Sequence, residues 1–280
     1  MADDGAGPVS DGDIDAYARD GVVWLKGVFA PHWIERLAEA FERAKASPGP
    51  EAVDHAPEEG AGRFVTDLFL WRRDPEVRRF LFESPAGAIA ARLMRAEAAT
   101  LFFDTMWIKE PGVRKPTAWH QDQPYYPVDG DQLAVVWLPL DPVPEEVALA
   151  FVRGSHRWHR WFEPTRTTDG TRFAKATSYE PVPDIDHAPP DTYDVIRKRM
   201  DPGDCVVFHG LTLHGAPGNP QKHRRRRALS IVCLGDDAIA SRRPSTRPRL
   251  ADTGFTPGQP FRGPHFPRLW PRENREGDQP

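Results

Sequence analysis

Apolar positions in the first third of the chain recur mostly with the spacing of an amphipathic helix. The clearest example follows Pro31, a residue type that is favoured in the first turn of a helix. There the apolar positions are Trp33, Ile34, Leu37, Ala38 and Phe41. Further helices are expected at 13–19, from 74 onward and at 86–94. Residues 21–25 are apolar and β-branched and predict a strand, whereas residues 48–62 are rich in Pro, Gly, Ala and Glu and predict a loop.

After about residue 99 the pattern changes to short apolar segments separated by Gly and Pro turns. Strands are expected at 100–109, 118–122, 132–139, 148–152, 204–209, 211–214 and 226–234. Many short strands of this kind predict a sandwich or barrel, including the double-sheet jelly roll. The fold class is therefore expected to be mainly β with flanking N-terminal helices.

The same pattern suggests how the chain is organised. We expect a mobile tail at residues 1–11 and one domain at 12–240, since all-β domains often reach this length. Within the domain, residues of about 158–200 are long, polar and without period, which predicts a lid or substrate insert. Residues 241–280 are expected to be a Pro/Arg-rich C-terminal extension.

Composition narrows the function classes. The net charge of −4 argues against a nucleic-acid partner. No apolar run approaches the ~20 residues that span a bilayer, and the start of the chain lacks a signal pattern, so we expect a cytoplasmic protein without a membrane partner. Its two cysteines, Cys205 and Cys233, are expected to be small buried apolar residues rather than a disulfide framework. The oligomeric state is not readable from the sequence.

The first candidate for chemistry is a His-x-Asp pattern. His120 and Asp122 lie two residues apart in the strand expected at 118–122, so their side chains should share a face. A histidine from a distant strand would complete a two-His-one-carboxylate set, which is typical of iron(II) oxygenases. His214 is favoured because it ends an apolar run just before the turn at 215–219, and His209 is the alternative.

The second candidate is an arginine run that leads into the strand at 226–234. An arginine that faces inward offers a bidentate fork to a carboxylate, such as the distal carboxylate of 2-oxoglutarate. Arg226 shares a face with Ala228 and Ser230, and Arg224 has the same parity, whereas Arg225 and Arg227 do not. The alternative is that residues 223–227 form a solvated basic patch or a nucleic-acid contact.

These motifs occur in a characteristic order. They are WHQD at 119–122, GSH at 154–156, DPGDCVVFHGLTLHGAPGN at 201–219 and RRALS at 226–230, preceded by DIDAYARDGVVWLKGVF at 13–29. Together they resemble the phytanoyl-CoA dioxygenase (PhyH) family of iron(II)/2-oxoglutarate-dependent oxygenases over roughly residues 12–236. The resemblance implies a double-stranded β-helix, a cupin-like jelly roll, with N-terminal helices packed outside.

The resemblance also implies roles for single residues. His120, Asp122 and His214 match the metal ligands of the family. Arg226 best matches its 2-oxoglutarate arginine, although the spacing keeps Arg225 as an alternative. Further co-substrate contacts are implied for Lys109 and Trp137, whose other interpretation is an exposed lysine and a core tryptophan. His156 of the GSH turn is expected to be structural.

The expected function is an Fe(II)/2-oxoglutarate-dependent dioxygenase, a hydroxylase. It would use O2 to oxidise an unactivated C–H bond of a small organic molecule such as a secondary metabolite, releasing succinate and CO2. Because related halogenases lack the carboxylate ligand, Asp122 favours hydroxylation. The alternatives are a 2-oxoglutarate-independent cupin-type metalloenzyme, which tends to use three histidines, and a catalytically degenerate binding protein. The substrate and the site of oxidation stay open.

Overall fold

The computed structural model describes residues 8–55, 62–165, 178–243 and 254–272 and is mainly β. The larger antiparallel sheet has the order β1-β10-β7-β12-β4-β3-β2, with β14 also paired to β4. Its strands are β1 (Val22–Leu25), β2 (Val53–Asp54), β3 (Phe64–Leu68), β4 (Ala99–Lys109), β7 (Leu133–Pro139), β10 (Cys205–His209), β12 (Arg226–Leu234) and β14 (Arg268–Trp270).

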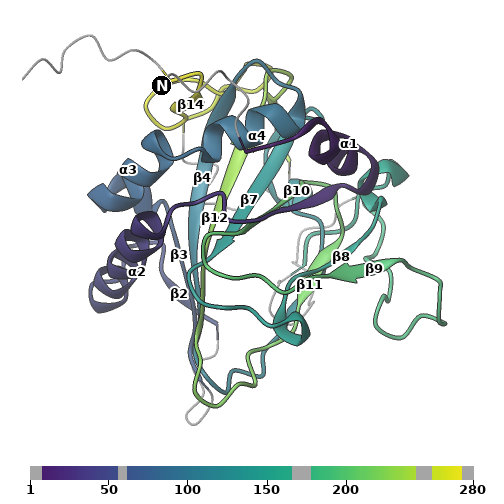
Figure 1. The fold of residues 1–280 in the computed structure, drawn as a ribbon. Coiled ribbons are helices and arrows are strands. Elements are labelled where there is room, and N and C mark those ends of the chain that lie inside the picture. Colours follow the sequence, from purple (N-terminus) through teal and green to yellow (C-terminus); the bar gives the residue numbers. More distant parts are fainter. Residues whose placement is uncertain (1–7, 56–61, 166–177, 244–253, 273–280) are drawn as a thin grey trace, which may run out of the picture.

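A smaller antiparallel sheet has the order β5-β11-β8-β9, and a separate pair joins β6 to β13. The bounds are β5 (Thr117–His120), β8 (Ala150–Val152), β9 (Val195–Arg197), β11 (His214–Ala216), β6 (Val128–Asp129) and β13 (Ile239–Ala240). The helices are α1 (Asp11–Asp20), α2 (Pro31–Ala46), α3 (Pro75–Glu83) and α4 (Ala86–Met94). They lie on one side of the larger sheet, and the smaller sheet lies on its other side (Figure 1).

The larger sheet is buried on both faces because its side chains alternate between two apolar layers. Toward the helices it presents Leu101, Met106, Ile108, Leu229 and Ile231. Toward the smaller sheet it presents Phe103, Val135, Trp137, Ala228 and Val232. The ladder between β12 and β4 runs through the middle of both layers and begins at the pair Arg226–Lys109. That pair therefore stands at one end of the longest ladder in the sheet.

Local sequence signals account for the helices. Ser10 and Asp13 form a capping box at the start of α1, and Asp74 caps α3 through the backbone N–H groups of Glu76 and Val77. Pro31 occupies the first turn of α2, whose buried residues include Leu37 and Phe41. None of the described helices has the length and apolar character needed to cross a bilayer.

Several predicted elements match the structure closely. The strand predicted at 226–234 is β12, the helix at 86–94 is α4, and the strand at 100–109 is β4 with one residue added. Both cysteines are buried and free, as expected. The fold is mainly β with flanking N-terminal helices, also as expected.

Two strand predictions are wrong at positions that matter for the site. The strand predicted at 118–122 ends at His120, and Asp122 has helical dihedral angles, φ −80° and ψ −45°. The strand predicted at 211–214 is a turn up to residue 213, so that β11 begins rather than ends at His214. In both places the chain leaves the extended conformation, and backbone groups from distant segments form hydrogen bonds with it there.

The predicted loop at 48–62 contains β2, and β3 directly after it was not predicted. The tail prediction for 1–11 is wrong at its end, because Val9 is buried and Ser10 caps α1. Residues 1–7 and 56–61 lie outside the described residues. The single-domain bounds of 12–240 stay a prediction.

The insert and the C-terminal extension are only partly described, since residues 166–177, 244–253 and 273–280 lie outside. Phe162 and Ile185 of the insert pack with Val152 and Leu213 on the outer side of the smaller sheet. In the extension, Phe261 and Phe266 pack against Phe102, and β14 pairs with β4. The lid role of residues 158–200 stays a prediction.

The core contact of α2 generates a stability prediction. Leu37 is fully buried in this helix. Leu37→Ala should lower the free energy of unfolding by about 2–5 kcal/mol, measured by urea denaturation, because the cavity left behind relaxes only in part. The matched control is Glu39→Ala on the exposed face of the same helix, which should stay within about 0.5 kcal/mol of the wild type. Equal effects of the two variants would contradict this packing.

Two histidines beneath α1 generate a pH prediction. Burial lowers the pKa of His156 to about 4, helped by the neighbouring His209, whose own pKa is also lowered by burial. Unfolded histidines titrate near 6.5. Below that pH these histidines become protonated in the unfolded chain but stay neutral in the folded protein. Acidification therefore lowers the free energy of unfolding.

Asp104 acts in the opposite direction, because burial raises its pKa to about 7. The test therefore compares variants rather than reading the wild-type slope alone. Between pH 7 and pH 5, the wild type should lose more stability in urea denaturation than His156→Gln does. An identical change in the two proteins would show that His156 is not buried in its neutral form.

Candidate metal centre and its cavity

Three side chains from two distant parts of the chain meet between the sheets. His120 ends β5, Asp122 follows it, and His214 begins β11 directly opposite His120. Asp122 Oδ1 lies 3.3 Å from His120 Nε2 and 4.0 Å from His214 Nε2. One possible ligand atom from each residue lies within 4.8 Å of the others, so the three could hold one metal ion. Their role as ligands stays a prediction.

Both imidazole rings are oriented by backbone carbonyls. His120 Nδ1 lies 2.8 Å from the Ala118 carbonyl oxygen, and His214 Nδ1 lies 3.0 Å from that of Thr212. Because a carbonyl oxygen only accepts, each Nδ1 carries a proton, and in the neutral ring Nε2 then keeps its lone pair. Burial lowers the pKa of His214 to about 4, and the nearby His120 lowers it further. His214 therefore stays neutral and able to coordinate at neutral pH.

Asp122 reaches this site by a route that differs from the predicted strand. Its backbone N–H and that of Gln123 both donate to the Gly210 carbonyl oxygen at 2.9 Å. These bonds turn the chain out of β5 into a short 3₁₀ helix, Gln123–Tyr125. The carboxylate thus faces the two rings because the chain bends, rather than because i and i+2 share a strand face.

The alternative ligand His209 is bound to backbone on both ring nitrogens. Its Nδ1 accepts from Leu211 N–H at 3.0 Å, so Nε2 donates to the Asp131 carbonyl oxygen at 2.7 Å. Neither nitrogen keeps a lone pair for a metal. His156, which was expected to be structural, contacts the backbone through one ring nitrogen, since its Nε2 lies 3.2 Å from the Ala18 carbonyl oxygen.

The donor set fits the metal that the sequence suggests. Two imidazoles and one carboxylate leave coordination positions open, which suits iron(II) and small oxygen ligands. A cavity opens beside the three residues. Apart from these three, it is lined by Phe64, Phe103, Thr105, Trp107, Lys109, Thr117, Tyr126, Val135, Trp137, Leu149, Phe208, Ala216, Arg226, Ala228, Ser230 and Val232.

Two cations are buried in this cavity at the end of the β4–β12 ladder. Lys109 is 2% exposed and Arg226 is 8% exposed. Lys109 Nζ donates to Thr117 Oγ1 at 3.0 Å and to the Pro217 carbonyl oxygen at 3.2 Å. Arg226 donates to the carbonyl oxygens of Val147 and Pro217. Among the described residues, no carboxylate lies within 4.0 Å of either cation.

Burial opposes the charge of both groups. It lowers the pKa of Lys109 well below its usual range, with a further contribution from the charge of Arg226. It also lowers the pKa of Arg226 to about 10. Two buried cations that have only neutral oxygen acceptors favour an anion in the same cavity, since burying a charge is costly unless it is paired.

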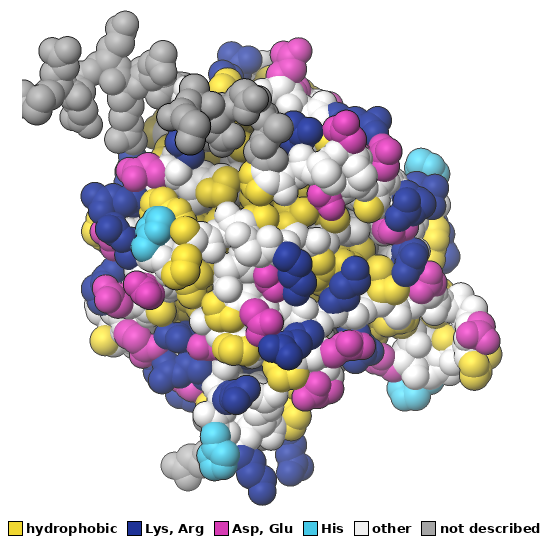
Figure 2. Space-filling model, in the orientation of Figure 1, with side chains coloured by type: hydrophobic (Ala, Val, Ile, Leu, Met, Phe, Trp, Pro, Cys, Tyr) yellow, Lys and Arg dark blue, Asp and Glu magenta, His cyan; other side chains and the backbone are white. Residues whose placement is uncertain are grey.

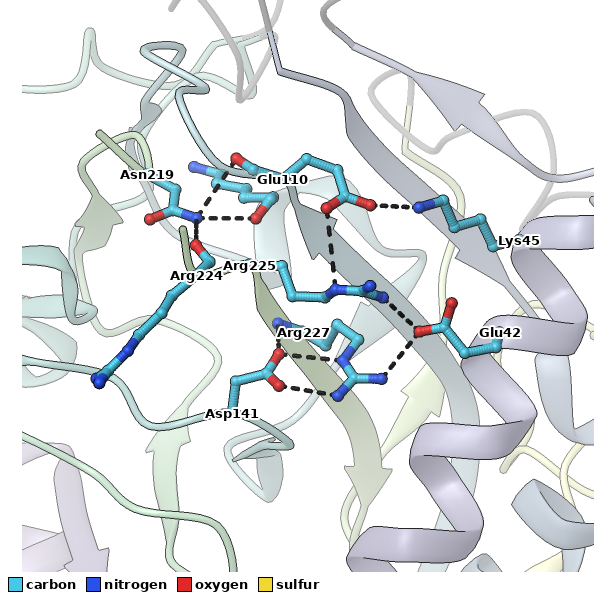
Figure 3. Close-up of polar contacts among 9 residues, drawn as sticks. Glu42, Lys45, Glu110, Asp141, Asn219, Arg224, Arg225 and Arg227 are labelled. Atoms are coloured by element: carbon cyan, nitrogen blue, oxygen red, sulfur yellow. Dashed lines mark hydrogen bonds and ion pairs between the residues drawn. The ribbon is translucent and has the colours of Figure 1, made fainter. Parts of the chain in front are cut away.

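The neighbouring arginines point the other way and are neutralised. Arg225 pairs with Glu42 of α2 and lies 4.0 Å from Glu110, and Arg227 pairs with Glu42 at 3.0 Å and with Asp141 at 2.8 Å (Figure 3). Arg224 is exposed. Of this run, only the side chain of Arg226 lies in the cavity. Arg225, the other candidate for the 2-oxoglutarate arginine, lies outside it.

Three of the four arginines at 224–227 make contacts within the fold. Two of them are held in ion pairs with acidic residues, and one is buried. Basic and acidic side chains are interspersed over the face shown in Figure 2. Such mixing provides no continuous positive surface for a phosphate backbone.

Some cavity residues were not predicted. Trp137 lines the cavity opposite Ser230 in the β12–β7 ladder, and its co-substrate contact stays a prediction. Trp107 and Ser230 were missed, although their indole N–H and hydroxyl bind each other at 2.8 Å. Strand periodicity could have found them, since residues 103, 105 and 107 share the face of Lys109, and residues 228, 230 and 232 share the face of Arg226. No comparable signal identifies Phe64, Leu149 or Phe208.

The polar residues around His120 divide between packing and lining. Gln121 donates to the carbonyl oxygens of Arg160 and Leu211 and accepts from Phe162 N–H. Tyr125 binds both backbone groups of Thr165. These two side chains hold the start of the insert against the site, whereas Tyr126 lines the cavity.

Comparisons with known proteins agree with this geometry. The chain is 25% identical to the multifunctional dioxygenase prhA of Penicillium brasilianum over 232 residues, 78% of this chain and 70% of prhA. The solved structure of SnoK, a non-heme alpha ketoglutarate dependent carbocyclase from nogalamycin biosynthesis, superposes with a TM-score of 0.73 at 23% identity, covering 93% of this chain and 96% of SnoK.

A second solved structure is the epimerase SnoN from the same biosynthesis, in complex with Fe3+, alpha ketoglutarate and nogalamycin RO. It superposes with a TM-score of 0.70 at 26% identity and covers 92% of this chain and 98% of SnoN. The family model for phytanoyl-CoA dioxygenase (PhyH) matches residues 17–228. The chain therefore belongs to the phytanoyl-CoA dioxygenase (PhyH) family.

Proposed function

We propose that this protein is an iron(II)- and 2-oxoglutarate-dependent dioxygenase that hydroxylates an unactivated C–H bond of a small organic molecule. The observation that carries the proposal is a cavity in which a two-His-one-carboxylate set faces two buried cations without carboxylate partners. One end of the cavity suits a metal, and the other suits a carboxylate. 2-Oxoglutarate has both features, a chelating keto acid and a distal carboxylate.

Each residue then has a defined role. His120, Asp122 and His214 hold iron(II), with the rings fixed by Ala118 and Thr212. Arg226 and Lys109 bind the distal carboxylate of 2-oxoglutarate, and Trp137 forms part of the wall beside it. When bound, iron(II) would activate O2 as 2-oxoglutarate is oxidised to succinate and CO2. The protein supplies position and exclusion of water.

We also propose that the fold is a double-stranded β-helix. The two facing antiparallel sheets belong to a double-stranded β-helix, with the metal set on the smaller sheet and the cations on the larger one. Family membership and the fold shared with SnoK and SnoN support it. Substrate would enter beside the aromatic residues that line the cavity, including Tyr126 and Trp107.

Hydroxylation rather than halogenation is proposed as the outcome, because Asp122 provides the carboxylate that related halogenases lack. Among the structural neighbours are a carbocyclase and an epimerase, so the fold is compatible with other oxidative outcomes. The substrate is proposed to be a free small molecule such as a secondary metabolite. The binding of nogalamycin RO by SnoN supports this class.

Two alternatives are less well supported. A cupin-type enzyme that works without 2-oxoglutarate would leave Arg226 and Lys109 buried without an anion. A catalytically degenerate binding protein would not need three intact donor side chains with both imidazole rings oriented.

The metal site is tested by anaerobic titration of the protein with iron(II) and then 2-oxoglutarate. The wild type should bind one iron(II) and develop a weak visible charge-transfer band, because 2-oxoglutarate chelates the metal. His214→Ala should lose the band, and the exposed His223→Ala should keep it. Iron binding without any band would exclude 2-oxoglutarate chelation. Absence of iron binding in the wild type would favour the degenerate binding protein.

The co-substrate site is tested with Arg226→Met. Removing charge-assisted hydrogen bonds should weaken 2-oxoglutarate binding about 10- to 100-fold, while the affinity for iron(II) changes little. Anaerobic isothermal titration of the metal-free protein with iron(II) measures the metal affinity, and titration of the iron-loaded protein with 2-oxoglutarate measures the co-substrate affinity. Arg224→Met is the matched control, since its side chain is exposed in the same run. Equal affinities in both variants would move the carboxylate site away from Arg226.

A further inference from the structure

We propose that the turn at residues 210–213, held by Ser155 and Thr212, is the element that positions the metal centre. Ser155 and Thr212 are thus positioning residues that act through the turn on Asp122 and His214. The inference rests on the proposed iron site. It assigns a role to the GSH motif at 154–156, which neither the metal set nor the cavity includes.

The turn connects the two halves of the metal set through its own carbonyl groups. Gly210 O accepts from the backbone N–H of Asp122 at 2.9 Å and so fixes where the carboxylate begins. Thr212 O accepts from His214 Nδ1 at 3.0 Å and so fixes that ring. A shift of this one turn would therefore displace two of the three donor side chains together.

Ser155 holds the residue that precedes His214. Its hydroxyl donates to the Val152 carbonyl oxygen at 2.7 Å and accepts from Leu213 N–H at 2.8 Å. In addition, Val152 N–H donates to the Leu213 carbonyl oxygen at 2.9 Å, so residues 152 and 213 are joined by two links. Ser155 is 1% exposed and Leu213 is fully buried, so no water can replace the hydroxyl without rearrangement.

Thr212 fixes the other side of the turn to the start of β1. Its hydroxyl donates to the Gly21 carbonyl oxygen at 2.8 Å, and His209 N–H donates to the same oxygen at 2.9 Å. Gly21 has φ +74°, and a Cβ there would lie 2.5 Å from Thr212 Oγ1. The glycine therefore lets the end of α1 approach the turn closely enough for this bond.

The GSH turn adds the third anchor. Gly154 N–H donates to the Asp20 carbonyl oxygen at 2.8 Å, and His156 Nε2 lies 3.2 Å from that of Ala18. The end of α1 is thereby joined to the same segment that contains Ser155. Helix α1, the end of β8 and the turn form one hydrogen-bonded unit that ends at His214.

The test measures iron(II) affinity and the charge-transfer band in four full-length variants. Ser155→Ala and Thr212→Val remove the two hydroxyls, whereas Thr212→Ser keeps the hydroxyl at position 212. Ser84→Ala is the matched control. Ser84 is also buried, but its hydroxyl accepts from Ala86 N–H at the start of α4. Thermal unfolding of each variant without metal separates loss of stability from loss of metal affinity.

We expect Ser155→Ala and Thr212→Val to raise the dissociation constant for iron(II) about 10- to 100-fold and to shift the band, as loss of groups that orient metal ligands generally does. Thr212→Ser should restore wild-type affinity. Ser84→Ala should lower the melting temperature without changing affinity. If folded Ser155→Ala and Thr212→Val bind iron(II) as tightly as the wild type, the inference is wrong and the iron site stands. If the wild type binds no iron(II), the proposed function itself fails.

Discussion

Two positive charges buried side by side at the end of one β-ladder are the constraint on which the rest of the site depends. Arg226 and Lys109 are register partners, and both face the cavity between the sheets. Their nearest acceptors are carbonyl and hydroxyl oxygens rather than carboxylates. Because an unpaired buried charge is costly, such a pair is stable chiefly when a ligand brings the opposite charge. In the proposed function, a metal at His120, Asp122 and His214 gives that ligand its second point of attachment.

The surrounding structure keeps this pair in register. The odd-numbered arginines on either side of Arg226 are tied to α2 and to the end of β7 by Glu42 and Asp141, which fixes the strand so that Arg226 points inward (Figure 3). On the opposite side of the cavity, the turn at 210–213 orients Asp122 and His214 through backbone carbonyls. The cavity is thus defined from both sheets by contacts outside it.

The sequence predicted the parts of the site that depend on local pattern. The mostly apolar segment at 228–234 predicts the strand that is β12, and strand parity then favours Arg226 over Arg225 for the inward position. The resemblance to the PhyH family supplied Lys109 and Trp137 as predicted co-substrate contacts. The local sequence pattern does not predict the bend at Asp122. The carbonyl oxygen that accepts its backbone N–H belongs to Gly210, which is far along the chain. The start of β11 at His214 was also missed, because its partners β5 and β8 are distant in the chain.

Longer-range packing explains the missed elements. Strand β3 contains Thr66 and Asp67, which read as polar but are buried, and an ion pair with Arg73 compensates Asp67. Strand β14 lies in a Pro-rich segment and forms only because β4 offers it an edge. In both cases the burial of a segment depends on partners that its own sequence does not show. The same holds for Phe64 and Phe208, which line the cavity from strands that are separated in the chain.

In the proposed function, one cavity holds a metal at His120, Asp122 and His214 and the distal carboxylate of 2-oxoglutarate at Arg226 and Lys109. The most direct measurement is a crystal structure of the protein grown anaerobically with iron(II) and 2-oxoglutarate, with anomalous diffraction at the iron edge. We expect an iron peak among the three donor side chains and 2-oxoglutarate extending from it to the two cations. An iron peak elsewhere, or a distal carboxylate that contacts neither Arg226 nor Lys109, would contradict the proposal.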